Sequence, residues 1–254
     1  MTRIQSQAEV VAGTDVDIKQ HQYVVAIVFF CELVGNGVIL AERWILSTAS
    51  MFYHIPHTKY SVATGTDHYP DQATWYEVDC VYKHPFYNGL DDNIALVSIE
   101  GAIEYTERVK PIALTYISDH TDTLAAEMLW YGTSVNKTIQ LRKVTFILTS
   151  DQSCVDQLSD QVAKHIITDR AGYCMMPEQG TYRAQWYNAS GAPIVVNNEL
   201  HAIFSFNEND GGAVATRLWH YRPWMMSVSN TLFKVVDRSE EERSRERPNE
   251  APGV

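Results

Sequence analysis

The chain is short of cysteine, of clustered positive charge and of long apolar runs, and each shortage excludes a class of protein. Its four cysteines include no Cys-x-x-Cys pair, which excludes a zinc ribbon and a thioredoxin-like redox site. A net charge of −11 with no basic block argues against nucleic acid and anionic membranes as partners. No apolar run approaches the roughly 20 residues that cross a bilayer. Apolar residues are abundant, at 45%, which is enough for a folded core.

Short apolar segments, punctuated by Gly, Asp, Asn and Pro, predict an all-β chain. The first series of segments comprises Val24–Phe30, Gly37–Leu40, Trp44–Ser47, Tyr60–Ala63, Trp75–Tyr82 and Ile94–Ile99. A connector, Glu104–Thr115, follows it. The second series comprises Glu127–Tyr131, Gln140–Thr149, Gly172–Met176, Pro193–Val196, Leu200–Phe206 and Ala213–Arg217. Strands at this spacing favour sandwiches or closed barrels.

Helical spacing occurs in two places. One is Ser153–Val162, and the other is a run from Trp224 in which apolar residues recur on one face. The second run predicts a helix over about 222–236, with Pro223 in its first turn. Residues 237–254 are predicted to be a charged, disordered tail, and residues 1–9 an N-terminal extension that lacks the apolar segment of a signal peptide.

Eight segments, in order and at matching distances, resemble the trypsin/chymotrypsin-like serine proteases. They are Val10–Gly13, Tyr23–Val25, Ala41–Leu46, Lys83–Tyr87 with Asn93–Leu96, Arg108–Ile112, Leu141–Val144, Ser190–Pro193 and Ile203–Phe206. The resemblance implies one homologous domain over 10–236, made of two antiparallel six-stranded β-barrels and a C-terminal helix. Barrel one is expected at about 24–110 and barrel two at about 122–218.

The resemblance also assigns the catalytic positions, and two of the three carry the wrong residue. The family uses a serine nucleophile, a histidine base and a buried aspartate that orients the histidine. Ser190 stands at the nucleophile position, but Ser50 stands at the base position and Asn93 at the aspartate position. Because a serine hydroxyl cannot take a proton near neutral pH, we expect no functional catalytic residue.

Neighbouring groups are weak substitutes. Asp92 adjoins Asn93, but successive extended residues point to opposite faces. His54 and His57 belong to the loop after Ser50, and together with His68 they form no regular ligand spacing, so we expect no metal and no cofactor.

Positions that serve activation and the oxyanion hole have also changed. Ala189 replaces the aspartate that receives the new N-terminus of the activated family members, and Glu9 stands where their cleavage site has Arg or Lys. Asn188 replaces the glycine of the oxyanion hole.

The primary specificity pocket is expected to be filled or reshaped. Ala184 occupies the position that sets its specificity, and Phe206 replaces a tryptophan. The bulky Trp186 and Tyr187 follow Ala184 closely.

The resemblance implies one disulfide, between Cys154 and Cys174. The bridge beside the family's histidine cannot form, since its positions are Gly35 and Met51, and Trp186 replaces the first cysteine of the bridge beside the nucleophile. Two interpretations remain open for Cys31 and Cys80: buried free thiols, or an unusual bridge within barrel one. Two glycosylation sequons begin at Asn136 and Asn188.

The resemblance therefore implies a secreted, monomeric and non-proteolytic binding, decoy or regulatory protein in an extracellular protease cascade. Its expected partners are proteins, such as proteases, inhibitors or complement-type components. Two alternatives stay open: a serine hydrolase with a rearranged site around Ser190, and a carrier or structural protein that uses the reshaped cleft.

Overall fold

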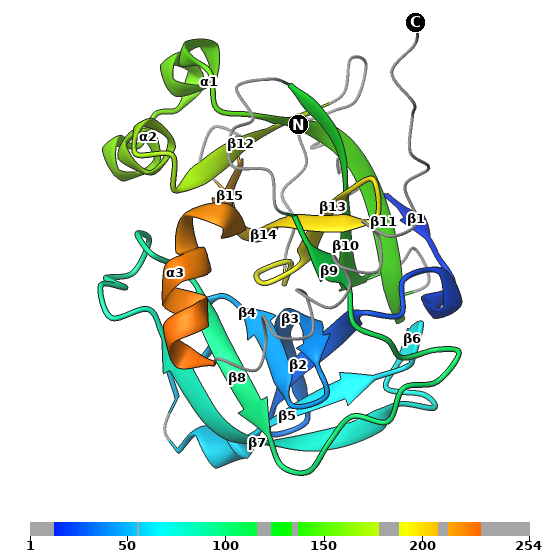
Figure 1. Cartoon of the computed structure of the whole chain (residues 1–254). Coiled ribbons are helices and arrows are strands. Elements are labelled where there is room, and N and C mark those ends of the chain that lie inside the picture. The colour runs from blue at the N-terminus through cyan, green and yellow to red at the C-terminus, as the bar shows by residue number, and fades with distance from the viewer. Residues whose placement is uncertain are drawn as a thin grey trace, which may run out of the picture.

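The chain folds into two closed β-barrels that lie one above the other, with a helix along one side (Figure 1). The computed structural model describes residues 13–54, 56–115, 123–133, 137–177, 188–207 and 213–229. Within this part of the chain, no helix is both long and apolar enough to cross a membrane.

Barrel one is a ring of six antiparallel strands. Its hydrogen-bonded order is β2-β3-β4-β8-β7-β5. The strands are β2 (Val24–Phe29), β3 (Glu32–Ala41), β4 (Trp44–Ser47), β5 (Tyr60–Thr64), β7 (Thr74–Lys83) and β8 (Ala95–Ile99). In β2, Val25 and Ile27 join the core inside the barrel, while the alternate residues Val24 and Ala26 join the core toward barrel two. Because both faces are covered, β2 is a continuous apolar run rather than an alternating one.

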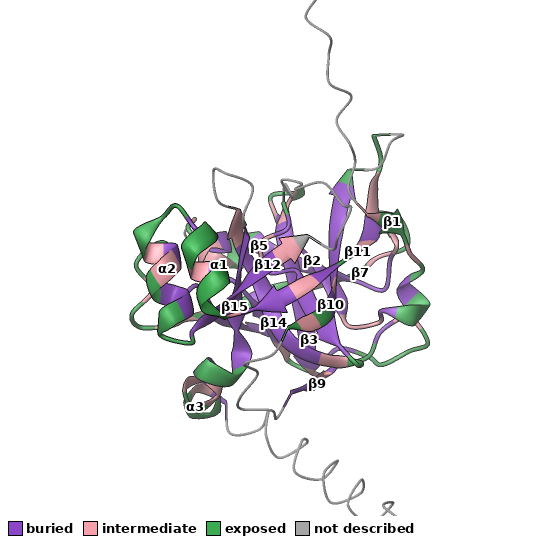
Figure 2. Cartoon of the chain, turned by 90° about the horizontal axis from the view of Figure 1, so that it is seen from above, coloured by how far each residue is buried: buried purple, intermediate pink, exposed green. Residues whose placement is uncertain are grey.

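Barrel two is closed by the pairing of β11 with β12. Its strands are β10 (Leu124–Thr133), β11 (Ile139–Thr149), β12 (Gly172–Pro177), β13 (Pro193–Val196), β14 (Glu199–Asn207) and β15 (Ala213–Arg217). Three short strands attach to it: β1 (Thr14–Asp15), β6 (His68–Tyr69) and β9 (Ala113–Leu114). Both predicted barrels are therefore confirmed, and Figure 2 shows their strands as the buried centre of the molecule.

The prediction of one helix over Ser153–Val162 is wrong, because two helices lie there. They are α1 (Gln152–Gln157) and α2 (Gln161–Thr168). Each has its own aspartate N-cap: Asp151 accepts a hydrogen bond from the N–H of Cys154, and Asp160 accepts one from the N–H of Val162. A second strong N-cap within the segment starts a new helix there.

The C-terminal helix differs from its predicted bounds. The helix α3 spans Leu218–Val228, and Ser229 after it is extended. It begins directly after β15 because Leu218 and Tyr221 are buried. Pro223 therefore lies inside the helix rather than in its first turn, and the carbonyl of residue 219 loses its usual partner. The predicted residues beyond 229 lie outside the described part of the chain.

The cysteines follow the predicted pairing in one case only. Cys154 and Cys174 form a disulfide with 6.0 Å between their Cα atoms, and it links α1 to β12. Cys31 and Cys80 are unbridged, and both are exposed, so the prediction of buried thiols is wrong. Cys31 lies in the turn after β2 and Cys80 on an outward-facing position of β7, and neither position faces a core.

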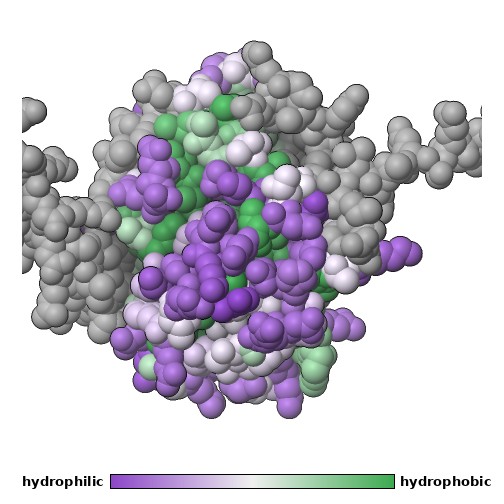
Figure 3. Space-filling model, turned by 90° about the vertical axis from the view of Figure 1, so that its right-hand side faces the viewer, coloured by the Kyte–Doolittle hydropathy of each residue, from purple (hydrophilic) through white to green (hydrophobic). Residues whose placement is uncertain are grey.

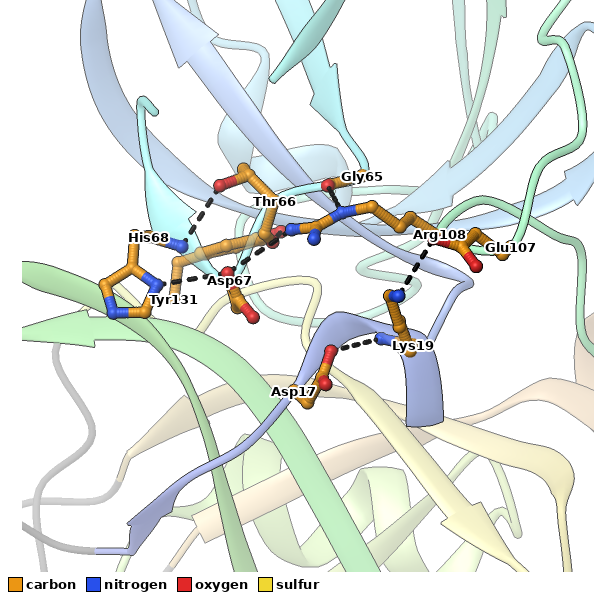
Figure 4. A network of polar contacts seen from close by, with 9 residues as sticks. All are labelled: Asp17, Lys19, Gly65, Thr66, Asp67, His68, Glu107, Arg108 and Tyr131. Carbon is orange, nitrogen blue, oxygen red and sulfur yellow. Dashed lines mark hydrogen bonds and ion pairs between the residues drawn. The ribbon is translucent and has the colours of Figure 1, made fainter. Parts of the chain in front are cut away.

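Polar contacts join the barrels on the face that carries β1 and β6. Viewed from that side, hydrophilic side chains gather over the middle of the face, with apolar ones between them (Figure 3). Asp67, next to β6, lies 3.4 Å from the guanidinium of Arg108 and 3.0 Å from Nδ1 of His68 (Figure 4). Arg108 also donates to the carbonyl of Gly65, and the hydroxyl of Tyr131 in barrel two donates to the carbonyl of Thr66.

We expect the disulfide to contribute substantially to stability. Replacing both Cys154 and Cys174 with alanine should lower the free energy of unfolding by about 3 kcal/mol, since the bridge closes a loop of 20 residues. Chemical denaturation of the two proteins measures the difference. As controls, Cys31→Ser and Cys80→Ser should change the value by less than about 0.5 kcal/mol. Equal stability with and without the bridge would contradict this expectation.

We expect Asp67 to make stability depend on pH. Partial burial raises the pKa of its carboxyl, but hydrogen bonds from His68 and the backbone and the charge of Arg108 outweigh burial, so the pKa lies below its usual value. A lowered pKa in the folded state stabilises the protein above the unfolded pKa, and that contribution is lost as the pH falls through the folded value. Wild type should therefore exceed Asp67→Asn in stability at pH 7, and the difference should shrink progressively below about pH 4.

Urea denaturation at pH 7 and pH 3 measures this difference. The control is Asp71→Asn, because the exposed carboxylate of Asp71 forms no ion pair within the described residues. A difference between wild type and Asp67→Asn that does not change with pH would refute the assignment.

Candidate active site

The three positions assigned to catalysis come from separate elements and lie in one hydrogen-bonded network. Ser50 belongs to the short 3-10 helix η2 (Ala49–Met51), which follows β4. Asn93 directly precedes Ile94 and β8, and Ser190 lies in the turn before β13. Ser205 of β14 contacts both Asn93 and Ser190, and so joins the two barrels at this point.

Asn93 is the centre of the network. Its side chain is buried, with 2% of the residue exposed. Its Oδ1 accepts a hydrogen bond of 2.9 Å from the N–H of Ser50, and its Nδ2 donates one of 2.8 Å to Oγ of Ser205. Its own carbonyl accepts from the hydroxyl of Thr216 at 3.2 Å. The amide uses one acceptor and one donor here, whereas an ionised carboxylate could only accept.

Ser50 offers no proton acceptor of suitable pKa to the nucleophile position. Its hydroxyl donates to Oγ1 of Thr48 at 3.3 Å, within barrel one. The residue is half-buried, and its backbone N–H is the group that Asn93 holds. The base position is thus occupied by a short side chain that bonds to its own segment.

Ser190 keeps a defined position. Its hydroxyl donates to the carbonyl of Ser205 at 3.3 Å, and its own carbonyl accepts from the N–H of Asn36 at 2.9 Å. Gly191 follows with φ +77°, and a Cβ there would collide with the carbonyl of Asn36 and the hydroxyl of Ser47. The turn of residues 188–192, here called the serine turn, contacts β3 so closely that position 191 requires glycine.

Asn188, which replaces the glycine of the family's oxyanion hole, adopts the left-handed conformation that usually favours glycine. Its φ is +55°, which asparagine tolerates better than most residues do. Its carbonyl accepts a 2.7 Å hydrogen bond from the side chain of Asn36. The loss of glycine alone therefore does not abolish the turn. Ala189 is buried and apolar, at the position where an aspartate would receive a new N-terminus.

Met51 occupies the space of the missing bridge beside the site. A Cβ on Gly35 would lie 2.8 Å from the sulfur of Met51 and 2.8 Å from the carbonyl of Ser190. Met51 is buried, so its thioether packs directly on the glycine backbone. Gly35 and Met51, which stand at the two cysteine positions of the family's bridge, therefore remain packed against each other.

The nearby ionisable groups are engaged elsewhere. Asp92 has its carboxylate 3.4 Å from Nδ1 of His84, whose ring contacts Tyr221 of α3 at 5.2 Å. Burial lowers the pKa of His84, although the charge of Asp92 opposes the shift. His54 stacks on Phe29 with the ring centroids 4.3 Å apart.

The histidines also do not gather around a metal site. Burial lowers the pKa of His57, and His68 pairs with Asp67 at a different place in the fold. Among the described residues, no group of three or more His, Cys, Asp or Glu side chains is placed to hold a metal ion.

The remaining assigned positions are only partly within the described residues. Phe206 is half-buried and packs against the core toward barrel two. The other positions lie outside the described residues, and they are Glu9 with Val10–Ala12, Asn136, Ala184, Trp186 and Tyr187. Asn188, which begins the second sequon, is exposed.

Two residues of the network were missed in the sequence. Asn36 lies fully buried in β3 and binds the turn that carries Asn188 and Ser190. A polar residue inside the apolar run Leu33–Ala41 was the available signal, because a buried amide needs partners. Ser205 lies within the segment Ile203–Phe206 that carries the resemblance, but its bond to Asn93 joins residues 112 positions apart, and no local pattern indicates it.

Comparisons with known proteins agree with this arrangement. A family model described as Trypsin matches residues 10–225. Trypsin II-P29 of Gallus gallus is 25% identical over 205 residues, which cover 76% of this chain and 78% of the relative. The snake venom serine protease catroxase-2 of Crotalus atrox is 22% identical over 236 residues, 86% of each chain. The structure of neuropsin, a serine protease expressed in the limbic system of mouse brain, matches with a TM-score of 0.71 at 20% identity, covering 85% of this chain and 98% of its own.

We expect the contact between Gly191 and Asn36 to be essential to the serine turn. Gly191→Ala should lower the free energy of unfolding by at least about 3 kcal/mol, because it adds a collision to an unfavourable φ. Gly101→Ala is the matched control, since Gly101 has φ +76° and nothing lies within 4 Å of an added Cβ. It should cost about 1 kcal/mol. Equal losses in the two variants, measured by urea denaturation, would show that the collision contributes nothing.

Proposed function

Because the chain belongs to the trypsin family of serine proteases, we propose that it is a member without proteolytic activity that acts by binding other proteins. The proposal places it outside the cell as a monomeric decoy, cofactor or antagonist in a protease cascade. It separates two properties that the family normally combines: the double barrel and the acyl-transfer chemistry between the barrels.

The observation that carries the proposal is the bonding of Asn93. Its amide is held by the N–H of Ser50 on one side and by the hydroxyl of Ser205 on the other. In serine proteases of this kind, an aspartate at this position holds the histidine in the correct tautomer, and replacing it with asparagine lowers turnover by about 10⁴. Here there is also no imidazole to hold.

Loss of the base weakens the nucleophile directly. Ser190 needs an adjacent group that accepts its proton as its oxygen attacks a carbonyl. Its hydroxyl instead donates to the carbonyl of Ser205, which has no basicity near neutral pH. Ser50 cannot supply a base either, because its hydroxyl is a poor proton acceptor and already bonds to Thr48.

The binding role and the extracellular location rest on indirect support. The disulfide between Cys154 and Cys174 is of the kind that persists in oxidising compartments. One relative is a venom protease by name, and venom is a secreted fluid. A net charge of −11 favours association with other proteins over nucleic acid or anionic membranes.

A serine hydrolase that uses Ser190 with other groups is the second candidate. The observation in its favour is that Ser190 is retained in the family's turn, with Gly191 at φ +77° behind it and Asn188 at φ +55° before it. A carrier that uses the cleft depends on Trp186 and Tyr187, which lie outside the described residues.

Labelling with a fluorophosphonate probe distinguishes these functions. We expect the folded protein to remain unlabelled under conditions that label trypsin completely, because an unactivated serine does not react at a useful rate. Mass spectrometry of the intact protein measures the adduct. Ser190→Ala is the diagnostic variant, and Ser227→Ala, on the exposed side of α3, is its control. Labelling that Ser190→Ala abolishes and Ser227→Ala leaves intact would overturn the proposal.

A further inference from the structure

The turn between β2 and β3 breaks two local rules at once. Phe29 pairs with Glu32, so Phe30 and Cys31 are the two residues of the turn. Their φ values are +46° and +71°. Two-residue hairpins with both φ values positive normally use Asn-Gly, because other side chains are strained there. Phe30 is also 62% exposed, although an apolar ring of this size is normally buried.

Phe30 is the end of a line of four rings in contact, whose pairs are T-shaped, stacked and tilted in turn. Its ring lies 4.6 Å from that of Phe29, which lies 4.3 Å from His54, which lies 4.0 Å from Tyr53. The two outer rings, Phe30 and Tyr53, are 62% and 67% exposed. These four residues, here called the aromatic strip, come from the end of β2, the turn after it and the loop after η2. Exposed aromatic side chains grouped in this way are typical of interaction surfaces.

The charge beside the aromatic strip is positive and unpaired. Nζ of Lys59 lies 5.7 Å from the centroid of Phe30, and the residue is exposed. Its ammonium group forms no ion pair with any described carboxylate, not even with Glu32 across the turn. In a chain of net charge −11, a lysine that forms no ion pair with a described carboxylate offers a site for a carboxylate of another molecule.

We propose that the aromatic strip and Lys59 bind an extended segment of a partner protein in which an acidic residue adjoins an aromatic or aliphatic one. The acidic residue pairs with Lys59, and its apolar neighbour packs against Phe30 and Phe29. A lipid surface is disfavoured, because the net charge of the chain repels anionic headgroups. The inference rests on the proposed binding function and names the chemistry of the partner.

The position of the aromatic strip fits a ligand that approaches the old active site. Tyr53 follows Ser50 by three residues, so one end of the strip lies next to the base position in sequence. Strain retained at a turn often marks a functional site, since a relaxed sequence would otherwise replace it. Phe30 and Cys31 would then be kept for binding, not for folding.

Selection of peptides on the full chain tests the proposal. The probe is a phage-displayed library of random twelve-residue peptides, selected on wild type and, in parallel, on the double variant Phe30→Asn with Cys31→Gly. We expect wild type to enrich Asp or Glu next to Phe, Trp, Leu or Ile, and the double variant to lose that enrichment. No such enrichment, or the same enrichment on both proteins, overturns the proposal.

The double variant also carries a readout that needs no ligand. Asn-Gly is the preferred pair for this turn, so the variant should unfold at a higher temperature than wild type while binding the selected peptides at least about tenfold more weakly. A decrease in both properties would indicate a purely structural role for the turn. The single variant Lys59→Glu then distinguishes a binding role from a structural one. Reversing this charge should weaken the binding of the acidic peptides about tenfold or more without changing the turn.

A control separates this test from the proposed function. Phe86 of barrel one is 75% exposed but lies outside the aromatic strip, so Phe86→Ser should leave peptide binding unchanged. Carrying out the selection on Ser190→Ala removes any reaction at the serine. If Ser190 is labelled while the peptides still bind, the proposed loss of activity is wrong and the proposed binding at the aromatic strip is supported. If no peptide binds and Ser190 stays unlabelled, only the proposed binding at the aromatic strip is wrong.

Discussion

The structure depends most on one buried amide, that of Asn36. All of its polar groups are used, and three of the four contacts cross between the barrels. Its N–H donates to the carbonyl of Ser190, its Nδ2 to the carbonyl of Asn188, and its Oδ1 accepts from the N–H of Tyr131. Its carbonyl accepts from the hydroxyl of Ser47. A fully buried amide without these partners would be strongly destabilising, so the serine turn must dock against β3 in this register.

This constraint explains how the geometry around Ser190 is held. Asn36 and Gly191 hold the turn that carries Ser190, and neither of them needs a histidine or an aspartate to do so. Asn93 is likewise satisfied by Ser50 and Ser205. The assigned positions Asn93 and Ser190 therefore take part in the contact between the barrels, because both bond to Ser205. Selection for stability alone would then preserve the geometry around Ser190.

The aromatic strip, unlike the contacts around Asn36, includes residues that are unfavourable for folding. Phe30 and Cys31 occupy backbone conformations that favour glycine, and the ring of Phe30 remains in water. The pairing of Phe29 with Glu32 is compatible with Asn-Gly, which is the usual pair of residues in a turn of this kind. The protein thus combines a candidate active site that is stabilised by its own contacts with a surface turn whose residues are unfavourable for its backbone conformation.

Most strands, the two barrels and the bridge between Cys154 and Cys174 could be predicted from the amino-acid sequence, because short apolar segments and a family-like order of motifs extend over many residues. The sequence also assigned Ser50, Asn93 and Ser190 to the three catalytic positions of the family, and the structure brings these residues into one hydrogen-bonded network. The sequence placed the C-terminal helix several residues late, since burial of Leu218 depends on its tertiary neighbours. Three features could be seen only in the folded molecule: the partners of Asn93, the contacts by which Asn36 joins the barrels, and the exposure of Cys31 in a strained turn. These properties are set by contacts between residues far apart in the chain, and local sequence patterns carry no record of them.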